Sequence, residues 1–73
     1  MISQEQRILT HLASFGSITP KEAMDEYGIM RLGARIYDLR QDGYDIRKTT
    51  EVSRNRYGQE TRYARYFMEA VNG

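Results

Sequence analysis

The chain has 73 residues, no cysteine and a formal net charge of +1. A chain of this length forms one domain, here expected over residues 1–73, with one small core, which argues against a deep catalytic cleft. The lack of cysteine excludes a disulfide scaffold and a cysteine-ligated zinc site.

No apolar stretch approaches the roughly 20 residues that span a bilayer. The first residues lack the apolar region of a signal peptide, so we expect a cytoplasmic protein without a membrane partner.

The charges are unevenly distributed along the chain. Residues 1–30 hold two basic and four acidic side chains, whereas residues 31–66 hold nine basic and five acidic ones. A basic half on a nearly neutral chain indicates binding to a polyanion, although an unevenly charged solvated surface gives the same pattern.

A first helix is predicted over residues 4–15. Ser3 and Gln6 have the spacing of a capping box, and Gly16 is placed to end the helix. His11, the single histidine, falls on a polar flank, so we expect a solvated side chain. Four residues at helical spacing mark the predicted apolar face: Ile8, Leu9, Leu12 and Phe15.

A second helix is predicted over residues 20–27, after a short extended link at residues 17–18. Thr19 is the expected N-cap, Pro20 occupies the first helical position, and Glu22 completes a capping box. Gly28 ends the helix. The predicted buried side consists of Ala23, Met24 and Tyr27.

A third short helix is predicted from Arg31 to the glycine at Gly43, which suits a left-handed cap. Its apolar stripe consists of Ile29, Leu32, Ile36 and Leu39. Gly33 is unusual, because glycine inside a helix costs about 1 kcal/mol relative to alanine. Either it allows close approach of the second helix, so that Gly33→Ala causes a clash, or it is simply tolerated.

Strand periodicity begins after Gly43. Residues 44–53 alternate and are rich in β-branched side chains, residues 55–59 supply turn chemistry around Gly58, and residues 62–68 form a second strand. Both faces of that strand are partly apolar, so alternation does not decide which is buried. Two short helices joined by a glycine-containing turn, followed by a hairpin, predict an α+β winged helix-turn-helix: three helices, a short strand and a C-terminal β-hairpin wing.

In helix-turn-helix docking the third helix enters the major groove of double-stranded DNA. Arg31, Ala34 and Arg35 are the first candidates for base contact, because arginine grips guanine with two hydrogen bonds and a small alanine permits close approach. For Arg35 the alternative is a salt bridge with Asp38 at i, i+3. The residues expected to face DNA from this helix are Arg31, Ala34, Arg35, Tyr37, Asp38 and Gln41. Of these, Tyr37 and Gln41 suit phosphate contacts.

The hairpin is the second candidate DNA contact. Its predicted contact residues are Arg54, Arg56, Tyr57 and Arg62. Arg65 adds a further positive charge, and Glu60 is the only acid between these arginines. Phosphate binding by such a hairpin is mostly non-specific and depends strongly on salt. The alternative is an ordinary edge hairpin whose charges prevent edge-to-edge aggregation.

Catalytic chemistry has no support in the sequence. No nucleophile motif, phosphate-binding glycine loop or cluster with metal-ligand spacing is present, so we expect neither an enzyme nor a cofactor.

The chain resembles a family of small winged helix-turn-helix proteins that are common in bacteriophages and prophages. The resemblance rests on residues 18–23, 27–28, 31–40, 43–46 and 63–66. It departs at Gly33, where alanine is expected, and at Lys21, where an apolar residue is common. The resemblance implies a DNA-binding fold in a phage or bacterial setting.

Two functions follow as hypotheses. The first is a sequence-specific DNA-binding protein, either a phage-type transcriptional regulator or a recombination accessory factor, for which tight binding needs a homodimer or tandem sites. The second is a protein-interaction module on the same fold, such as a phage inhibitor or antirepressor that binds a host or phage protein. The near-zero net charge and the acidic first two helices keep the second hypothesis open as the alternative.

Overall fold

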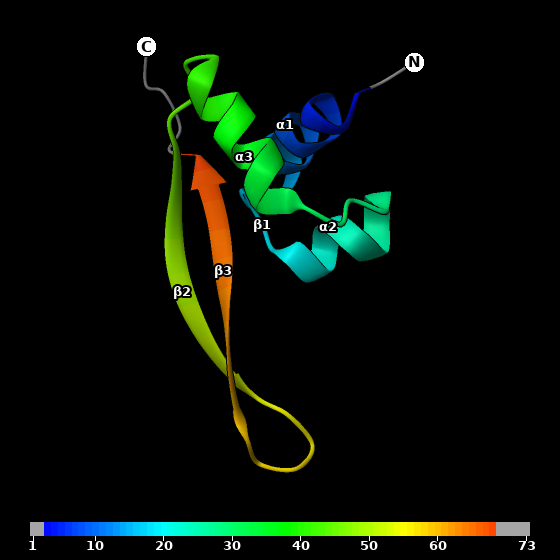
Figure 1. The fold of residues 1–73 in the computed structure, drawn as a ribbon, viewed down its shortest axis with the longest axis vertical. Helices are drawn as coiled ribbons and strands as arrows, with labels where there is room; N and C mark the ends of the chain where they lie inside the picture. Colours follow the sequence, from blue (N-terminus) through cyan, green and yellow to red (C-terminus); the bar gives the residue numbers. More distant parts are fainter. Residues whose placement is uncertain (1–2, 69–73) are drawn as a thin grey trace.

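A computed structural model describes residues 3–68, and it contains three helices beside a three-stranded antiparallel sheet (Figure 1). The elements in chain order are α1 (Gln4–Phe15), β1 (Ser17–Ile18), α2 (Pro20–Tyr27), α3 (Leu32–Gln41), β2 (Ile46–Arg54) and β3 (Glu60–Met68). The predicted α+β class is confirmed. The predicted bounds of α1, β1 and α2 are also confirmed, whereas α3 begins one residue later than predicted and β3 two residues earlier.

The N-terminal caps fix where α1 and α2 begin. Ser3 Oγ accepts a hydrogen bond from the backbone N–H of Gln6, at 3.2 Å. Thr19 Oγ1 accepts from the N–H of Glu22 at 3.2 Å, while the Glu22 carboxylate accepts from the N–H of Thr19 at 2.9 Å. These reciprocal bonds form the predicted capping box and satisfy N–H groups that have no partner within the helix.

The end of α3 explains where β2 begins. Gly43 has φ +102°, its N–H donates to the carbonyl of Arg40, and the N–H of Tyr44 donates to the carbonyl of Leu39, both at 3.1 Å. This is a Schellman motif, which confirms the predicted left-handed cap. Because Tyr44 completes this cap, the strand starts at Ile46 rather than at residue 44.

The sheet has the strand order β1-β3-β2. The two long strands pair from Ile46↔Met68 to Arg54↔Glu60, which extends β3 back to Glu60. In the connecting turn the Asn55 side-chain oxygen accepts from the N–H groups of Tyr57 and Gln59. The distal half of the hairpin projects beyond the helices as a long arm (Figure 1).

The core lies between the three helices and the proximal end of the sheet. It is formed by Ile8, Leu12, Ile18, Ala23, Ile29, Leu32, Ile36, Leu39 and Ile46. The predicted apolar stripe of α3 is therefore confirmed. Tyr66 and Met68 pack against this cluster, so the face of β3 that carries them is the inner one.

Three predictions about α1 and α2 are wrong. Phe15 is 73% exposed and Met24 is 43% exposed, so neither belongs to the core. His11, expected in solvent, is only 5% exposed, and its Nδ1 is hydrogen-bonded to the Tyr27 hydroxyl at 2.7 Å. The helical period was correct, but the last turn of α1 carries Phe15 beyond the core, where its ring centroid lies 4.6 Å from that of His11.

Gly33 does not make room for α2, contrary to the first of its two predicted roles. A Cβ atom built there would meet, outside the backbone of its own helix, only the Tyr66 hydroxyl oxygen at 3.7 Å. That oxygen belongs to β3, and the distance is an ordinary van der Waals contact. The predicted clash of Gly33→Ala therefore has no basis in the packing.

Candidate nucleic-acid interface

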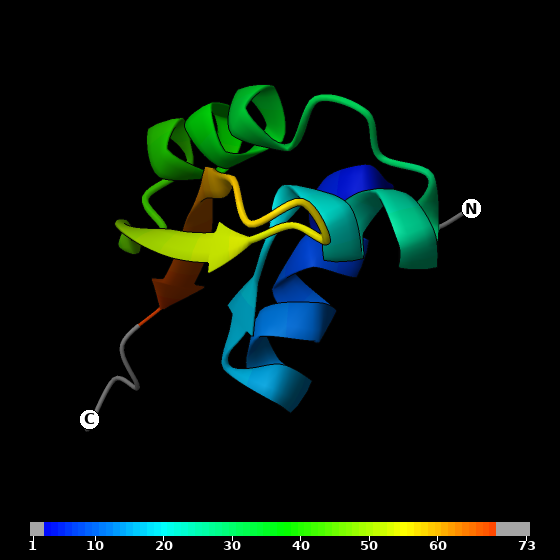
Figure 2. The same ribbon diagram turned by 90° about the horizontal axis from the view of Figure 1, so that it is seen from below.

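The turn between α2 and α3 sets the direction of the third helix. Gly28 has φ +66°, and its N–H donates to the carbonyl of Met24 at 2.9 Å. The N–H of Ile29 then donates to the carbonyl of Ala23 at 3.1 Å, and the Ile29 side chain is buried. Seen from the hairpin side, α3 lies along one margin of the molecule with a long side uncovered (Figure 2).

The uncovered side of α3 carries some of the residues predicted to face DNA. Arg31 and Gln41 are exposed, and Tyr37 is 62% exposed, whereas Ala34 and Asp38 are half-buried. Arg31 is not helical, because its φ of −126° and ψ of 66° place it at the N-cap. The prediction that the helix includes Arg31 is therefore wrong, although its carbonyl still accepts the first bonds of α3.

Arg35 has the ion pair that the sequence offered as an alternative to base contact. Its Nη2 lies 3.2 Å from the Asp38 carboxylate, and its side chain is half-buried. Both residues therefore lie along the flank of α3 rather than at its most exposed position.

The three arginines and one tyrosine that were predicted to contact DNA from the hairpin are all exposed. Arg54 ends β2 opposite Glu60, and Arg62 lies opposite Val52 near the start of β3. Arg56 and Tyr57 are in the turn. Within residues 3–68 the side chains of Arg54, Arg56 and Arg62 have no ion-pair partner. The projecting end of the hairpin thus presents unneutralised positive charge.

The sequence matches a family model described as a winged helix-turn-helix domain over residues 3–71. The protein belongs to this family. A comparison with curated proteins gave no match. Membership confirms the resemblance at the level of the fold, with α2, the turn and α3 as the helix-turn-helix and β2–β3 as the wing. Domains of this kind are typically non-enzymatic and bind DNA, so the family suggests DNA as the partner.

Arg65 belongs to the base of the wing and not to its free positive charge. Its Nε donates to the Glu51 carboxylate at 2.6 Å, and its Nη1 donates to Ser17 Oγ at 2.9 Å and lies 3.6 Å from the Glu22 carboxylate. The hydrogen bond from Arg65 holds the pKa of Glu51 below its usual value. Arg65 therefore ties β3 to β1, β2 and α2, and the prediction that it adds to the wing's free charge is wrong.

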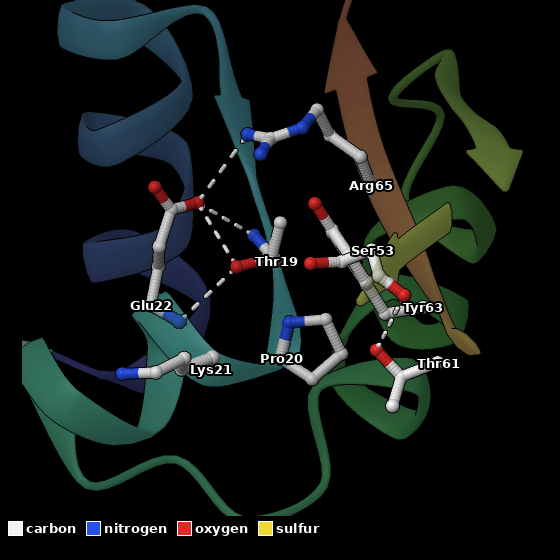
Figure 3. Close-up of a pocket in the computed structure, with 8 residues that line it drawn as sticks. All are labelled: Thr19, Pro20, Lys21, Glu22, Ser53, Thr61, Tyr63 and Arg65. Atoms are coloured by element: carbon white, nitrogen blue, oxygen red, sulfur yellow. Dashed lines mark hydrogen bonds and ion pairs between the residues drawn. The ribbon is translucent and has the colours of Figure 1, made fainter. Parts of the chain in front are cut away.

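A cleft of about 520 Å³ lies between the N-terminus of α2 and the wing (Figure 3). Its lining consists of Thr19, Pro20, Lys21, Glu22, Ser53, Thr61, Tyr63 and Arg65. The charged groups of this lining are paired, because Lys21 bridges to Asp25 and Arg65 approaches Glu22. We call it the α2–wing cleft; it offers hydroxyl groups but little net charge.

A second, smaller cleft of about 280 Å³ lies beside the start of α3. It is lined by Gln4, Gly28, Met30, Arg31 and Arg35, and we call it the α1–α3 cleft. Gln4 and Met30 are not among the residues predicted from the sequence to form a site. No local signal links Gln4 to Arg31, because their proximity depends on how α1 packs against the turn.

Within residues 3–68, no group of three or more histidine, aspartate and glutamate side chains is arranged to hold a metal ion. In the same part of the chain, no helix has both the length and the apolar character needed to cross a membrane.

Proposed function

We propose that this protein binds double-stranded DNA sequence-specifically, as a phage-type transcriptional regulator or recombination accessory factor in the cytoplasm of a bacterial host. Residues 1–73 act as a single DNA-binding domain. In this proposal α3 enters the major groove and the wing lies on the phosphate backbone.

The distribution of unpaired cations carries the proposal. Arg54, Arg56 and Arg62 on the wing and Arg31 at the start of α3 form no ion pair within residues 3–68. By contrast, Arg65 at the base of the wing is neutralised. Charges that remain free at the two elements that contact DNA in helix-turn-helix docking supply the phosphate attraction that dominates affinity.

The uncovered side of α3 supplies the base contacts in this proposal. Ala34 permits close approach or touches a thymine methyl group, whereas Tyr37, which is 62% exposed, and Gln41, the last residue of α3, suit phosphate contacts. Arg31 and Arg35 stand at the end of α3 that enters the groove, so they contact either guanine edges or the flanking phosphates.

One recognition helix covers few base pairs, so tight binding is expected to need two copies of the chain on adjacent half-sites. Sedimentation of the protein with and without its preferred duplex measures this stoichiometry.

Selection from a random duplex library, followed by fluorescence anisotropy at 50 and 200 mM salt, tests the proposal. Arg56→Ala is expected to weaken binding by a similar factor on all sequences and to reduce the magnitude of the salt slope by about 1. Ala34→Gln, which enlarges the side chain predicted to approach the bases, is expected to change the preference for the selected sequence. Arg7→Ala, which removes an exposed charge from α1, serves as the matched control. Failure of the wild-type protein to bind any duplex at 50 mM salt would refute the proposal.

A second candidate function is a protein-interaction module, such as a phage inhibitor or antirepressor that binds a host or phage protein. The exposed apolar side chains of Phe15 on α1 and of Met24 on the acidic helix α2 favour it. In that case we expect Phe15→Ser to abolish the inhibitory or antirepressor effect of the protein in host cells. The protein then either binds no DNA or binds it equally well with and without the substitution.

A further inference from the structure

The α1–α3 cleft brings together two arginines from one turn of the chain. Arg31 is the N-cap of α3, and its carbonyl accepts a hydrogen bond from the N–H of Arg35 at 3.3 Å. Both residues line the cleft, together with Gln4. Two guanidinium groups in one concave site are suited to an anion with several oxygen acceptors, because each group presents its donors in a planar fork.

Arg35, which lines this cleft, has an unused hydrogen-bond donor. Its Nη2 pairs with Asp38, but its Nε is buried and has no hydrogen-bond partner within residues 3–68. Leaving a buried donor unpaired is unfavourable, and such groups in folded proteins call for an explanation. An oxygen acceptor bound in the cleft supplies one once the partly exposed Arg35 side chain turns its Nε toward it.

Arg31 has no ion-pair partner within the described residues, and its side chain is exposed. Gln4 adds the first turn of α1 to the site, where backbone N–H groups carry partial positive charge. The α2–wing cleft offers less to an anion, since Arg65 and Lys21 already have carboxylate partners.

We infer that the α1–α3 cleft binds one phosphate of the DNA backbone through Arg31 and Arg35. This inference rests on the proposed function and deepens it. Arg31 and Arg35 then fix the position of α3 on the duplex without reading sequence, and Ala34 remains the first candidate for discrimination between bases.

Two measurements test the inference. In the first, inorganic phosphate is titrated into the ¹⁵N-labelled protein, and the backbone amides of Gln4, Gly28 and Arg31 are expected to shift together. Arg35→Gln is expected to abolish these shifts, whereas Arg7→Gln, which removes a charge from α1 outside the lining, is expected to retain them. Unchanged shifts in Arg35→Gln would overturn the inference even if the protein binds no DNA.

In the second measurement, the selected duplex and a scrambled duplex are bound at 50 and 200 mM salt. Loss of one phosphate contact reduces the salt slope by about 0.9, so the fall in affinity over this fourfold salt range becomes about 3.5-fold smaller. Arg31→Gln and Arg35→Gln are expected to show this change with an equal loss on both duplexes. Asp38→Asn, which removes the competing carboxylate, is expected to tighten binding to both.

A loss confined to the selected duplex, with the slope unchanged, would make these arginines base readers and would overturn the inference while leaving the proposed function intact. Because Arg31 is exposed, its variant tests the site even if Arg35→Gln lowers the melting temperature.

Discussion

Replacing Gly33 with alanine is expected to stabilise the protein. Gly33 is the second residue of α3, and positive φ values within residues 3–68 are confined to Gly16, Gly28, Gly43 and Gly58. The helix therefore does not need glycine at this position. The added Cβ meets only the Tyr66 hydroxyl oxygen at 3.7 Å, which requires no movement.

The expected gain follows from helix propensity. Glycine is about 1 kcal/mol less favourable than alanine in a helix interior, largely because the unfolded glycine chain has more conformations to lose. A position in the first turn receives less than the full benefit, so we expect roughly 0.5–1 kcal/mol. For a domain of this size, 1 kcal/mol corresponds to a change in Tm of about 4–8 °C, so the variant is expected to gain about 2–8 °C.

Thermal and urea unfolding followed by circular dichroism measure this gain. Gly16→Ala is the matched control, since its Cβ also has free space but the backbone has φ +86°. That variant is expected to lose about 1 kcal/mol or more, because alanine tolerates left-handed backbone poorly. A lower Tm for Gly33→Ala than for the wild-type protein would refute the reasoning and would mean that the packing of α3 on β3 is tighter than the structure indicates.

Three further substitutions test individual contacts. Thr19→Ala removes the N-cap of α2 and is expected to cost about 1 kcal/mol in urea unfolding, with Thr19→Ser retaining most of the stability; equal losses would contradict this. Tyr27→Phe leaves Nδ1 of the buried His11 without its partner and is expected to cost about 1–3 kcal/mol, so an unchanged urea midpoint would argue against that hydrogen bond. Arg65 lowers the pKa of Glu51, so their pair stabilises the fold above the usual glutamate pKa of 4.5, and this contribution disappears as the pH falls through the lowered value. Glu51→Gln is therefore expected to destabilise at pH 7 and to flatten the acid side of the stability–pH curve; parallel curves would show that the pair contributes nothing.

The helices of the fold were predictable because their signals are local. The capping box at Thr19 and the glycine at Gly43 act within a few residues, so their effect can be derived from spacing alone. The inner face of β3 was not predictable, because both faces carry aromatic or apolar side chains. Its choice depends on Tyr66 and Met68 meeting helices from elsewhere in the chain.

Side-chain environments were harder to predict for the same reason. His11 is polar, and nothing near it in sequence indicates that Tyr27, sixteen residues later, supplies a hydrogen bond that makes burial tolerable. The position of Arg65 in the second strand of the hairpin predicts a free wing arginine. Its partners Glu22 and Ser17, however, precede α3 in the chain. Long-range pairing therefore decides which charges remain available for a ligand.

This pairing explains how a chain with a net charge of +1 can suit DNA. Arg35, Arg47 and Arg65 form ion pairs with acidic side chains, whereas Arg31 and the three wing arginines Arg54, Arg56 and Arg62 form none within residues 3–68. The weak overall field gives little long-range steering, so affinity depends on these short-range contacts. If the three wing arginines each hold one phosphate and Arg31 and Arg35 share a fourth, affinity falls by about 150-fold between 50 and 200 mM salt. A slope that corresponds to only one or two phosphates would mean that the wing does not touch the backbone, and the exposed apolar side chains of α1 and α2 would then become the better candidates for the functional surface.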